Sequence, residues 1–235
     1  MALPDSPAGD ADAFCPSAGN GRLREGDALK FYWGPMDCGK STLALQMGYN
    51  HARQGRRGIV LTRNDRSRQP QVTTRIGLSR EAIEVTDDLD LIALVRKEWA
   101  DGAPVDYLIC DEACFYTVEQ IEQLADMVDI YDIDVYAFGL ATDFRAQLFP
   151  AAQRLFELAD SVHRLQVEVL CWCGRVGLLN ARIVGGSVAR EGEQVVIGDT
   201  AGVPASDEVD EVRYQVLCRR HYRTGDLGVR TQDPQ

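Results

Sequence analysis

The stretch GPMDCGKS, from Gly34 to Ser41, decides the fold. It meets the pattern G-x-x-x-x-G-K-S in full, between a β-prone run at residues 28–33 (ALKFYW) and a predicted helix from Ser41 to about Gln54. Glycines let backbone N–H groups turn inward around phosphates, and the start of a helix adds positive potential. The context therefore favours a phosphate-binding P-loop over a chance glycine-rich turn.

The side chains of such a loop have separate tasks. Lys40 is expected to reach the β- and γ-phosphates of a nucleoside triphosphate, and the Ser41 hydroxyl to ligate Mg²⁺. The predicted phosphate-binding residues are Gly34, Pro35, Met36, Asp37, Cys38, Gly39, Lys40, Ser41 and Thr42.

Compact apolar runs on the carboxyl side of the loop predict further strands at residues 58–62, 105–110 and 134–139. Thr117-Val-Glu-Gln120 predicts a capped helix start, and the polar stretch from Arg63 to Arg75 predicts a loop. Strands that alternate with helices predict an α/β fold with a parallel sheet flanked by helices. Ligands then bind at the carboxyl ends of the strands.

An acidic pair, Asp111 and Glu112, closes the strand that ends at Cys110. P-loop proteins place an acidic residue there that helps to hold the metal, so Asp111 is the second predicted magnesium ligand beside Ser41. Glu112 is the candidate catalytic residue, which would take or orient the proton of an attacking hydroxyl. The alternative is that both are solvated acids at a strand end.

Two pairs of metal-binding residues lie in the last third of the chain. Cys171-x-Cys173 and Cys218-x-x-His221 supply four ligands for a tetrahedral Zn²⁺. Because protein fills all four positions, the site would be structural and would support a unit too small for a large core. The C-x-C step is tighter than usual, so buried free thiols remain the alternative.

Composition limits the organisation and the partners. We expect a flexible extension at residues 1–27, a P-loop domain at 28–165, a zinc-binding domain at 166–225 and a tail at 226–235. The net charge of −11 argues against a nucleic-acid polymer or an anionic membrane as partner. The sequence shows neither a signal peptide nor a spanning segment, so the expected location is the cytoplasm.

Seven blocks, in order along the chain, resemble the type II thymidine kinases, the cellular-type, zinc-containing family. The blocks are GPMDCGKST at 34–42, TTRIGLS at 73–79, DEACF at 111–115, GLATDFRAQLF at 139–149, CWCG at 171–174, GEQVVIGD at 192–199 and YQVLCRRHY at 214–222. The resemblance covers residues 29–222, which is most of the chain.

The resemblance implies that the γ-phosphoryl group of ATP, with Mg²⁺, is transferred to the 5′-hydroxyl of thymidine, giving thymidine monophosphate for nucleotide salvage. Glu112 matches the catalytic base of the family, and Arg145 is expected to help stabilise the phosphates. The resemblance also implies a homotetramer and feedback inhibition by thymidine triphosphate.

The family holds thymidine with a loop called the lasso, here about Arg182 to Tyr214. By motif matching, Val196, Ile197 and Gly198 supply backbone contacts, and Tyr214 packs on the nucleoside. The matched apolar pocket consists of Met36, Phe115, Leu140, Phe144 and Phe149. Without the resemblance, these five residues would be read as ordinary core.

The chain departs from the family at Cys114, where glutamine is common, at Asn64, where aspartate is common, and in a longer lasso between Asp199 and Tyr214. A thiol cannot replace an amide as both donor and acceptor. Two alternatives therefore stay open: a deoxynucleoside kinase with a shifted base preference, and an ATP-binding member with weakened or lost catalysis.

Overall fold

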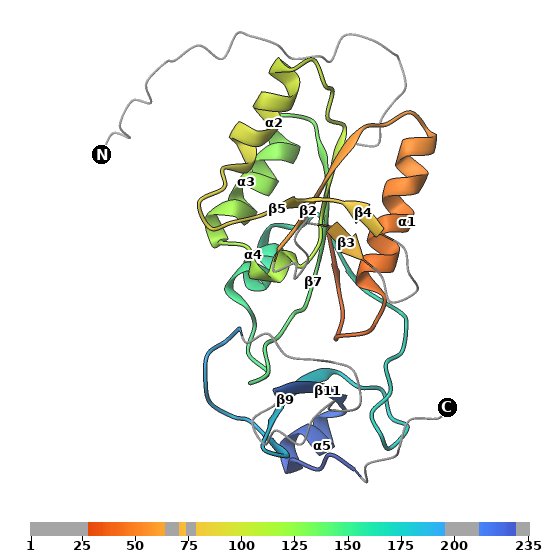
Figure 1. Ribbon diagram of the computed structural model, residues 1–235, viewed down its shortest axis with the longest axis vertical. Helices are drawn as coiled ribbons and strands as arrows, with labels where there is room; N and C mark the ends of the chain where they lie inside the picture. Colours follow the sequence, from red (N-terminus) through yellow and green to blue (C-terminus); the bar gives the residue numbers. More distant parts are fainter. Residues whose placement is uncertain (1–27, 64–70, 74–78, 196–211, 229–235) are drawn as a thin grey trace, which may run out of the picture.

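The structure is a computed structural model that describes residues 28–63, 71–73, 79–195 and 212–228. Its main element is a six-stranded sheet with the order β5-β2-β6-β7-β1-β8 (Figure 1), in which all neighbouring strands are parallel. The strands are β1 (Leu29–Trp33), β2 (Gly58–Thr62), β5 (Ile83–Glu84), β6 (Tyr107–Cys110), β7 (Asp134–Gly139) and β8 (Ser161–Arg164). The predicted parallel α/β sheet is confirmed.

Helices cover both faces of this sheet because its strands are apolar on both sides. The helices are α1 (Lys40–Arg53), α2 (Leu91–Ala100), α3 (Val118–Asp129) and α4 (Pro150–Leu158), with a short 3-10 helix η1 (Ala113–Phe115). On β6, Tyr107 and Ile109 point to the core under α1, whereas Leu108 and Cys110 point to the core under the other helices. Successive strand residues face opposite sides, so a continuous apolar strand fills two cores.

The capping box predicted at Thr117 is present. The Thr117 side chain accepts from the backbone N–H of Gln120 at 3.1 Å, and the Gln120 side chain accepts from the backbone N–H of Thr117 at 3.0 Å. The Gln120 amide also donates to the carbonyls of Thr86 and Leu89. The cap therefore fixes the start of α3 and the loop before α2 together.

The prediction of a loop from Arg63 to Arg75 was partly wrong. This stretch contains β3 (Gln71–Thr73), which pairs antiparallel with β4 (Ser79–Glu81). Val72 is 2% exposed and packs in the core under α1. A three-residue strand made by pairing and burial leaves too short a pattern to be recognised locally.

A second, antiparallel sheet follows the first along the chain. It contains β9 (Leu179–Val184), β10 (Ser187–Val188) and β11 (Arg213–Leu217), and α5 (Arg219–Thr224) packs beside it in the lower part of Figure 1. Its core is small, consisting of Cys171, Ala181, Leu217, Cys218 and Tyr222. A core of this size gives little hydrophobic stabilisation, so the unit needs another source of stability.

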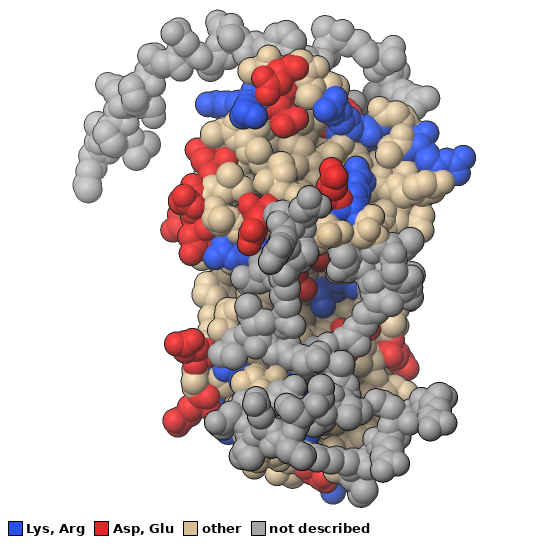
Figure 2. All heavy atoms as spheres, in the orientation of Figure 1, with Lys and Arg blue, Asp and Glu red and all other residues tan. Residues whose placement is uncertain are grey.

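Acidic side chains gather along the edge of the molecule where Figure 1 draws α2 and α3 (Figure 2), in keeping with a net charge of −11. Such an edge repels other polyanions. Among the described residues, no helix combines the length and apolar character that crossing a bilayer requires.

Candidate active site

The P-loop connects β1 to α1 at the carboxyl edge of the large sheet. Gly39 adopts a left-handed conformation with φ 81°, which glycine tolerates at no steric cost. Gly34 is required for another reason: a Cβ at this position would lie 2.5 Å from Sγ of Cys38, which is itself buried. Lys40 is 7% exposed, and its Nζ donates to the carbonyl of Pro35 at 3.1 Å, so its ammonium group lies across the loop.

Ser41 and Asp111 bring the P-loop and the end of β6 together. The Ser41 hydroxyl donates to Oδ2 of Asp111 at 2.8 Å. The other oxygen, Oδ1, is buried and has no hydrogen-bond partner among the described residues. A hydroxyl and a carboxylate with a free lone pair are ligands of the kind Mg²⁺ prefers. The two predicted magnesium residues therefore fit that ion.

The environment of Asp111 disfavours its charge. Burial, and then the nearby charge of Glu112, raise the pKa of the Asp111 carboxyl to about 7, although the Ser41 hydrogen bond and Lys40 oppose this. A cation beside Oδ1 would favour the ionised form instead. Binding of a metal at Oδ1 would therefore be coupled to loss of the Asp111 proton.

Glu112 occupies a strained turn between β6 and η1. Its φ is 53°, a backbone conformation that residues other than glycine rarely adopt. Such residues are concentrated at functional sites. The side chain is half-buried, and the Cys114 thiol donates to its Oε2 at 3.9 Å. Burial raises the pKa of Cys114 well above its usual value, so this thiol stays protonated and acts as a donor. Cys114 thus contacts the candidate base directly.

The five residues of the predicted apolar pocket are all buried or half-buried. Leu140 and Phe149 belong to the main core, and Met36 and Phe115 pack against it; the Phe115 and Phe149 rings meet edge to face with centroids 5.2 Å apart. Phe144 is 2% exposed and instead faces Arg182 of the small sheet. Four of the five therefore also serve as core.

The side chain of Arg145 is paired with a carboxylate of the protein. Its Nε and Nη2 donate to Oδ2 of Asp143 at 2.9 and 2.8 Å, and Asp143 is 2% exposed. The guanidinium that was expected to help stabilise the phosphates is therefore paired with a buried carboxylate. Val196, Ile197 and Gly198 of the predicted lasso lie outside the described residues, as does Asn64. Tyr214 lies on β11 and is half-buried.

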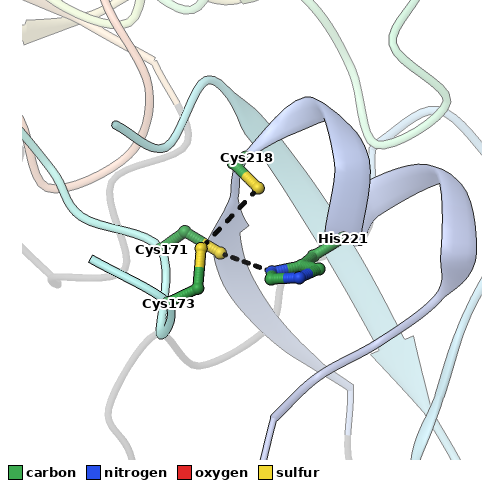
Figure 3. Close-up of side chains that lie close together, drawn as sticks. All are labelled: Cys171, Cys173, Cys218 and His221. Carbon is green, nitrogen blue, oxygen red and sulfur yellow. Dashed lines mark hydrogen bonds between the residues drawn. The ribbon is translucent and has the colours of Figure 1, made fainter. Parts of the chain in front are cut away.

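The four predicted zinc ligands meet in the small unit. The ligand atoms of Cys171, Cys173, Cys218 and His221 all lie within 4.8 Å of one another (Figure 3). Cys171 Sγ is 3.4 Å from His221 Nδ1, and Cys173 Sγ is 4.0 Å from Cys218 Sγ. Gly174, directly after the C-x-C step, has φ 77°, and its N–H donates to the carbonyl of Cys171 and so closes a turn around the two cysteines.

This arrangement favours a metal over free thiols. Three sulfurs and one imidazole nitrogen converge, as a closed tetrahedral zinc site requires. Trp172 stacks on the His221 ring with centroids 4.3 Å apart and so helps to fix its orientation. The donor set fits a structural Zn²⁺, which would stabilise the small core around Cys171 and Cys218.

Two residues that sequence reasoning missed join the small sheet to the P-loop domain. Asn180 and Arg182 are 4% and 3% exposed and lie two positions apart on β9, so they share one face of the strand. Oδ1 of Asn180 accepts from the backbone N–H of Met36 at 2.8 Å. The available signal was the pair of polar residues at a spacing of two within the strand LNARIV.

Comparison with known proteins agrees with this geometry. Residues 27–222 match the family model described as Thymidine kinase. A thymidine kinase of Streptomyces avermitilis is 53% identical over 195 residues, covering 83% of this chain and 88% of the relative. One of Cutibacterium acnes is 52% identical, covering 85% and 90%, and one of Legionella pneumophila strain Paris is 35% identical, covering 85% and 91%. This chain therefore belongs to the thymidine kinase family, as the resemblance to its zinc-containing type II members implied.

Proposed function

We propose that the chain transfers the γ-phosphoryl group of ATP to the 5′-hydroxyl of thymidine and so makes thymidine monophosphate. The observation that carries the proposal is the 2.8 Å hydrogen bond between Ser41 of the P-loop and Asp111 at the end of β6. It joins the phosphate-binding loop to the residue beside the candidate base. The relatives from Streptomyces avermitilis and Cutibacterium acnes are named thymidine kinase.

The residues of the site divide the reaction between them. The P-loop backbone and Lys40 hold the phosphates, and Ser41 and Asp111 hold Mg²⁺. When bound, Mg²⁺ neutralises phosphate charge as it develops during transfer. Glu112 orients the 5′-hydroxyl and accepts its proton, while the strained backbone at Glu112 fixes the direction of its carboxylate.

The nucleoside half is proposed at the junction of the two sheets. Its side chains are Met36, Phe115, Leu140, Phe144, Phe149 and Tyr214, and Val196, Ile197 and Gly198 supply backbone contacts. The burial of Phe144 against Arg182 supports a site at this junction, because one residue comes from the loop after β7 and the other from β9 of the small sheet. With the proposed domain boundary near residue 165, the P-loop domain supplies one part of this site and the zinc-binding domain, with its lasso, supplies the other.

A nucleoside kinase with another preferred base is the second candidate, and Cys114 favours it. Its thiol contacts Glu112, where the family commonly has an amide. We also propose from the family a cytoplasmic homotetramer that thymidine triphosphate inhibits.

Purified protein with Mg·ATP should phosphorylate thymidine, measured by the formation of thymidine monophosphate. Equimolar thymidine, deoxyuridine and deoxycytidine in one reaction decide between the candidates. Preferential consumption of thymidine supports the first candidate, and preference for another base supports the second. ATP binding without transfer to any nucleoside would leave only a non-catalytic member of the family.

A further inference from the structure

Arg182 is a buried cation at the junction of the two sheets. It lies on β9 and is 3% exposed. Its guanidinium carbon is 3.7 Å from the centre of the Phe144 ring and 5.6 Å from that of the Tyr214 ring. Both aromatic residues belong to the proposed nucleoside site, one from the loop after β7 and the other from β11. Arg182 therefore contacts two parts of that site that are distant in sequence.

Each nitrogen of this guanidinium donates a hydrogen bond. Nε donates to the Tyr214 hydroxyl at 3.0 Å, Nη1 to the carbonyl of Glu193 at 2.7 Å, and Nη2 to the carbonyl of Gln194 at 3.1 Å. Glu193 and Gln194 come just before Val196, Ile197 and Gly198, the proposed backbone contacts to the base. One planar group thus holds Glu193 and Gln194 of the lasso, Tyr214 and Phe144 together.

Packing alone does not account for an arginine at this position. Burying a charge is costly unless it is well hydrogen-bonded, and among the described residues no carboxylate forms an ion pair with Arg182. Its three acceptors are neutral, and each is bonded by a different nitrogen of the guanidinium. Lysine offers a single ammonium group and cannot make the same set of directed contacts.

We infer that Arg182 is a positioning residue for the nucleoside half of the site. By fixing Glu193 and Gln194 of the lasso against Tyr214 and Phe144, it organises the pocket before thymidine binds, so less ordering is required on binding. Two further contacts join the same pieces: Gln194 Nε2 donates to Oδ2 of Asp143 at 3.3 Å, and the Tyr222 hydroxyl donates to the carbonyl of Phe144 at 2.7 Å. The inference rests on the proposed thymidine kinase function.

The test compares steady-state kinetics of the wild type with those of Arg182→Gln and Arg182→Lys. We expect the KM for thymidine to rise about 10- to 100-fold in both variants, with the KM for ATP and kcat within about 3-fold. Arg190→Gln is the matched control. Arg190 also donates to backbone carbonyls, those of Tyr222 and Arg223, and lies over the Tyr222 ring. It is exposed, and these partners include none of the proposed nucleoside residues that the structure describes.

A merely structural role would give a different pattern. In that case the Arg182 variants would have a lower zinc content or melting temperature, and the KM values for both substrates would rise alike. Alternatively, Arg190→Gln would change the kinetics as Arg182→Gln does. Either result, or an unchanged KM for thymidine, would overturn the inference. Should the Arg182 variants fail to fold, Tyr214→Phe removes the hydroxyl that accepts from Nε of Arg182, and we expect its KM for thymidine to rise about 3- to 10-fold.

Binding separates this inference from the proposed activity. If the wild type does not phosphorylate thymidine, the proposed function fails, but calorimetric titration with thymidine still compares wild type and Arg182→Gln. Weaker binding by the variant supports the positioning role, and equal affinity or no binding to the wild type overturns it.

Discussion

The backbone N–H of Met36 donates to Oδ1 of Asn180 at 2.8 Å, although 144 positions separate the two residues. Met36 lies inside the P-loop, and Asn180 lies on β9 of the small sheet with 4% exposure. β9 pairs with β11, which leads directly into Cys218. A backbone donor of the phosphate loop is therefore held by the unit that carries the proposed zinc site.

Asn180→Leu should weaken ATP binding. The substitution leaves the part-buried Met36 N–H without its acceptor, at a cost of about 1–2 kcal/mol, which corresponds to a rise in the KM for ATP of about 5- to 30-fold. The control is Asn50→Leu, because Asn50 is an exposed residue of α1 whose amide oxygen accepts from the side chain of Gln46 on the same helix. An unchanged KM for ATP in Asn180→Leu would show that the P-loop keeps its shape without this contact.

Glu112→Gln should lower kcat by about 100- to 10,000-fold, the usual contribution of a positioned general base. The amide keeps the size and a hydrogen-bond acceptor but cannot take the proton of the 5′-hydroxyl. Binding of a fluorescent ATP analogue should be retained, since Lys40 and Ser41 are untouched. A variant with the wild-type rate would remove Glu112 from the mechanism.

The pH dependence of stability should report on Asp111. Its pKa is about 7 in the folded protein and about 3.9 when unfolded, so folding favours the protonated carboxyl. In the absence of divalent metal, this contribution is complete below about pH 4 and is lost as the pH rises to about 7. Asp111→Asn does not titrate. The difference in melting temperature, wild type minus variant, should therefore decrease as the pH rises from about 4 to about 7. A constant difference contradicts the assignment.

Magnesium should change that dependence. Because a cation beside Oδ1 favours the ionised carboxylate, Mg·ATP should stabilise the wild type more at pH 8 than at pH 6, measured as the shift in melting temperature on adding it. The matched Asp111→Asn protein should show a smaller shift with little dependence on pH over this range. Equal shifts for both proteins would place the metal elsewhere.

Gly34→Ala should distort the P-loop because the added methyl group would clash with the side chain of Cys38. The added Cβ would lie 2.5 Å from Sγ of Cys38 but 3.4 Å from its Cβ. We therefore expect Gly34→Ala to weaken ATP binding, and the double variant with Cys38→Ala to recover most of the loss. A double-mutant cycle on ATP affinity measures the coupling. Simple additivity of the two changes would mean that the loop backbone, not Cys38, resists the methyl group.

Zinc analysis should find about one zinc per chain purified without chelator. His221→Ala should lose the metal and lower the melting temperature, because the small core around Cys171 and Tyr222 cannot replace it. Cys114→Ala is the control, since Cys114 lies in the other core and should keep full zinc content. Metal-free wild-type protein with an unchanged melting temperature would contradict the structural role.

The local sequence determined the elements whose physics is local. Residues 34–41 specified the P-loop because a phosphate-binding turn needs glycines at fixed positions, and Thr117 and Gln120 specified a helix start because a capping box satisfies backbone groups within one turn. The spacing of Cys171, Cys173, Cys218 and His221 specified a ligand set, since tetrahedral coordination uses short paired spacings. The strand β3 escaped prediction because its stability comes from β4 and from burial of Val72.

Tertiary structure alone decided how the two units meet. Nothing in the periodicity of LNARIV says that Asn180 faces the N–H of Met36 or that Arg182 lies over Phe144. Those contacts depend on the relative placement of two sheets, and the residues that join them, such as Tyr222 and Phe144, lie far apart in the sequence. The sequence therefore determined which chemistry the chain carries, and the fold decided which buried polar residues hold the parts of the site together.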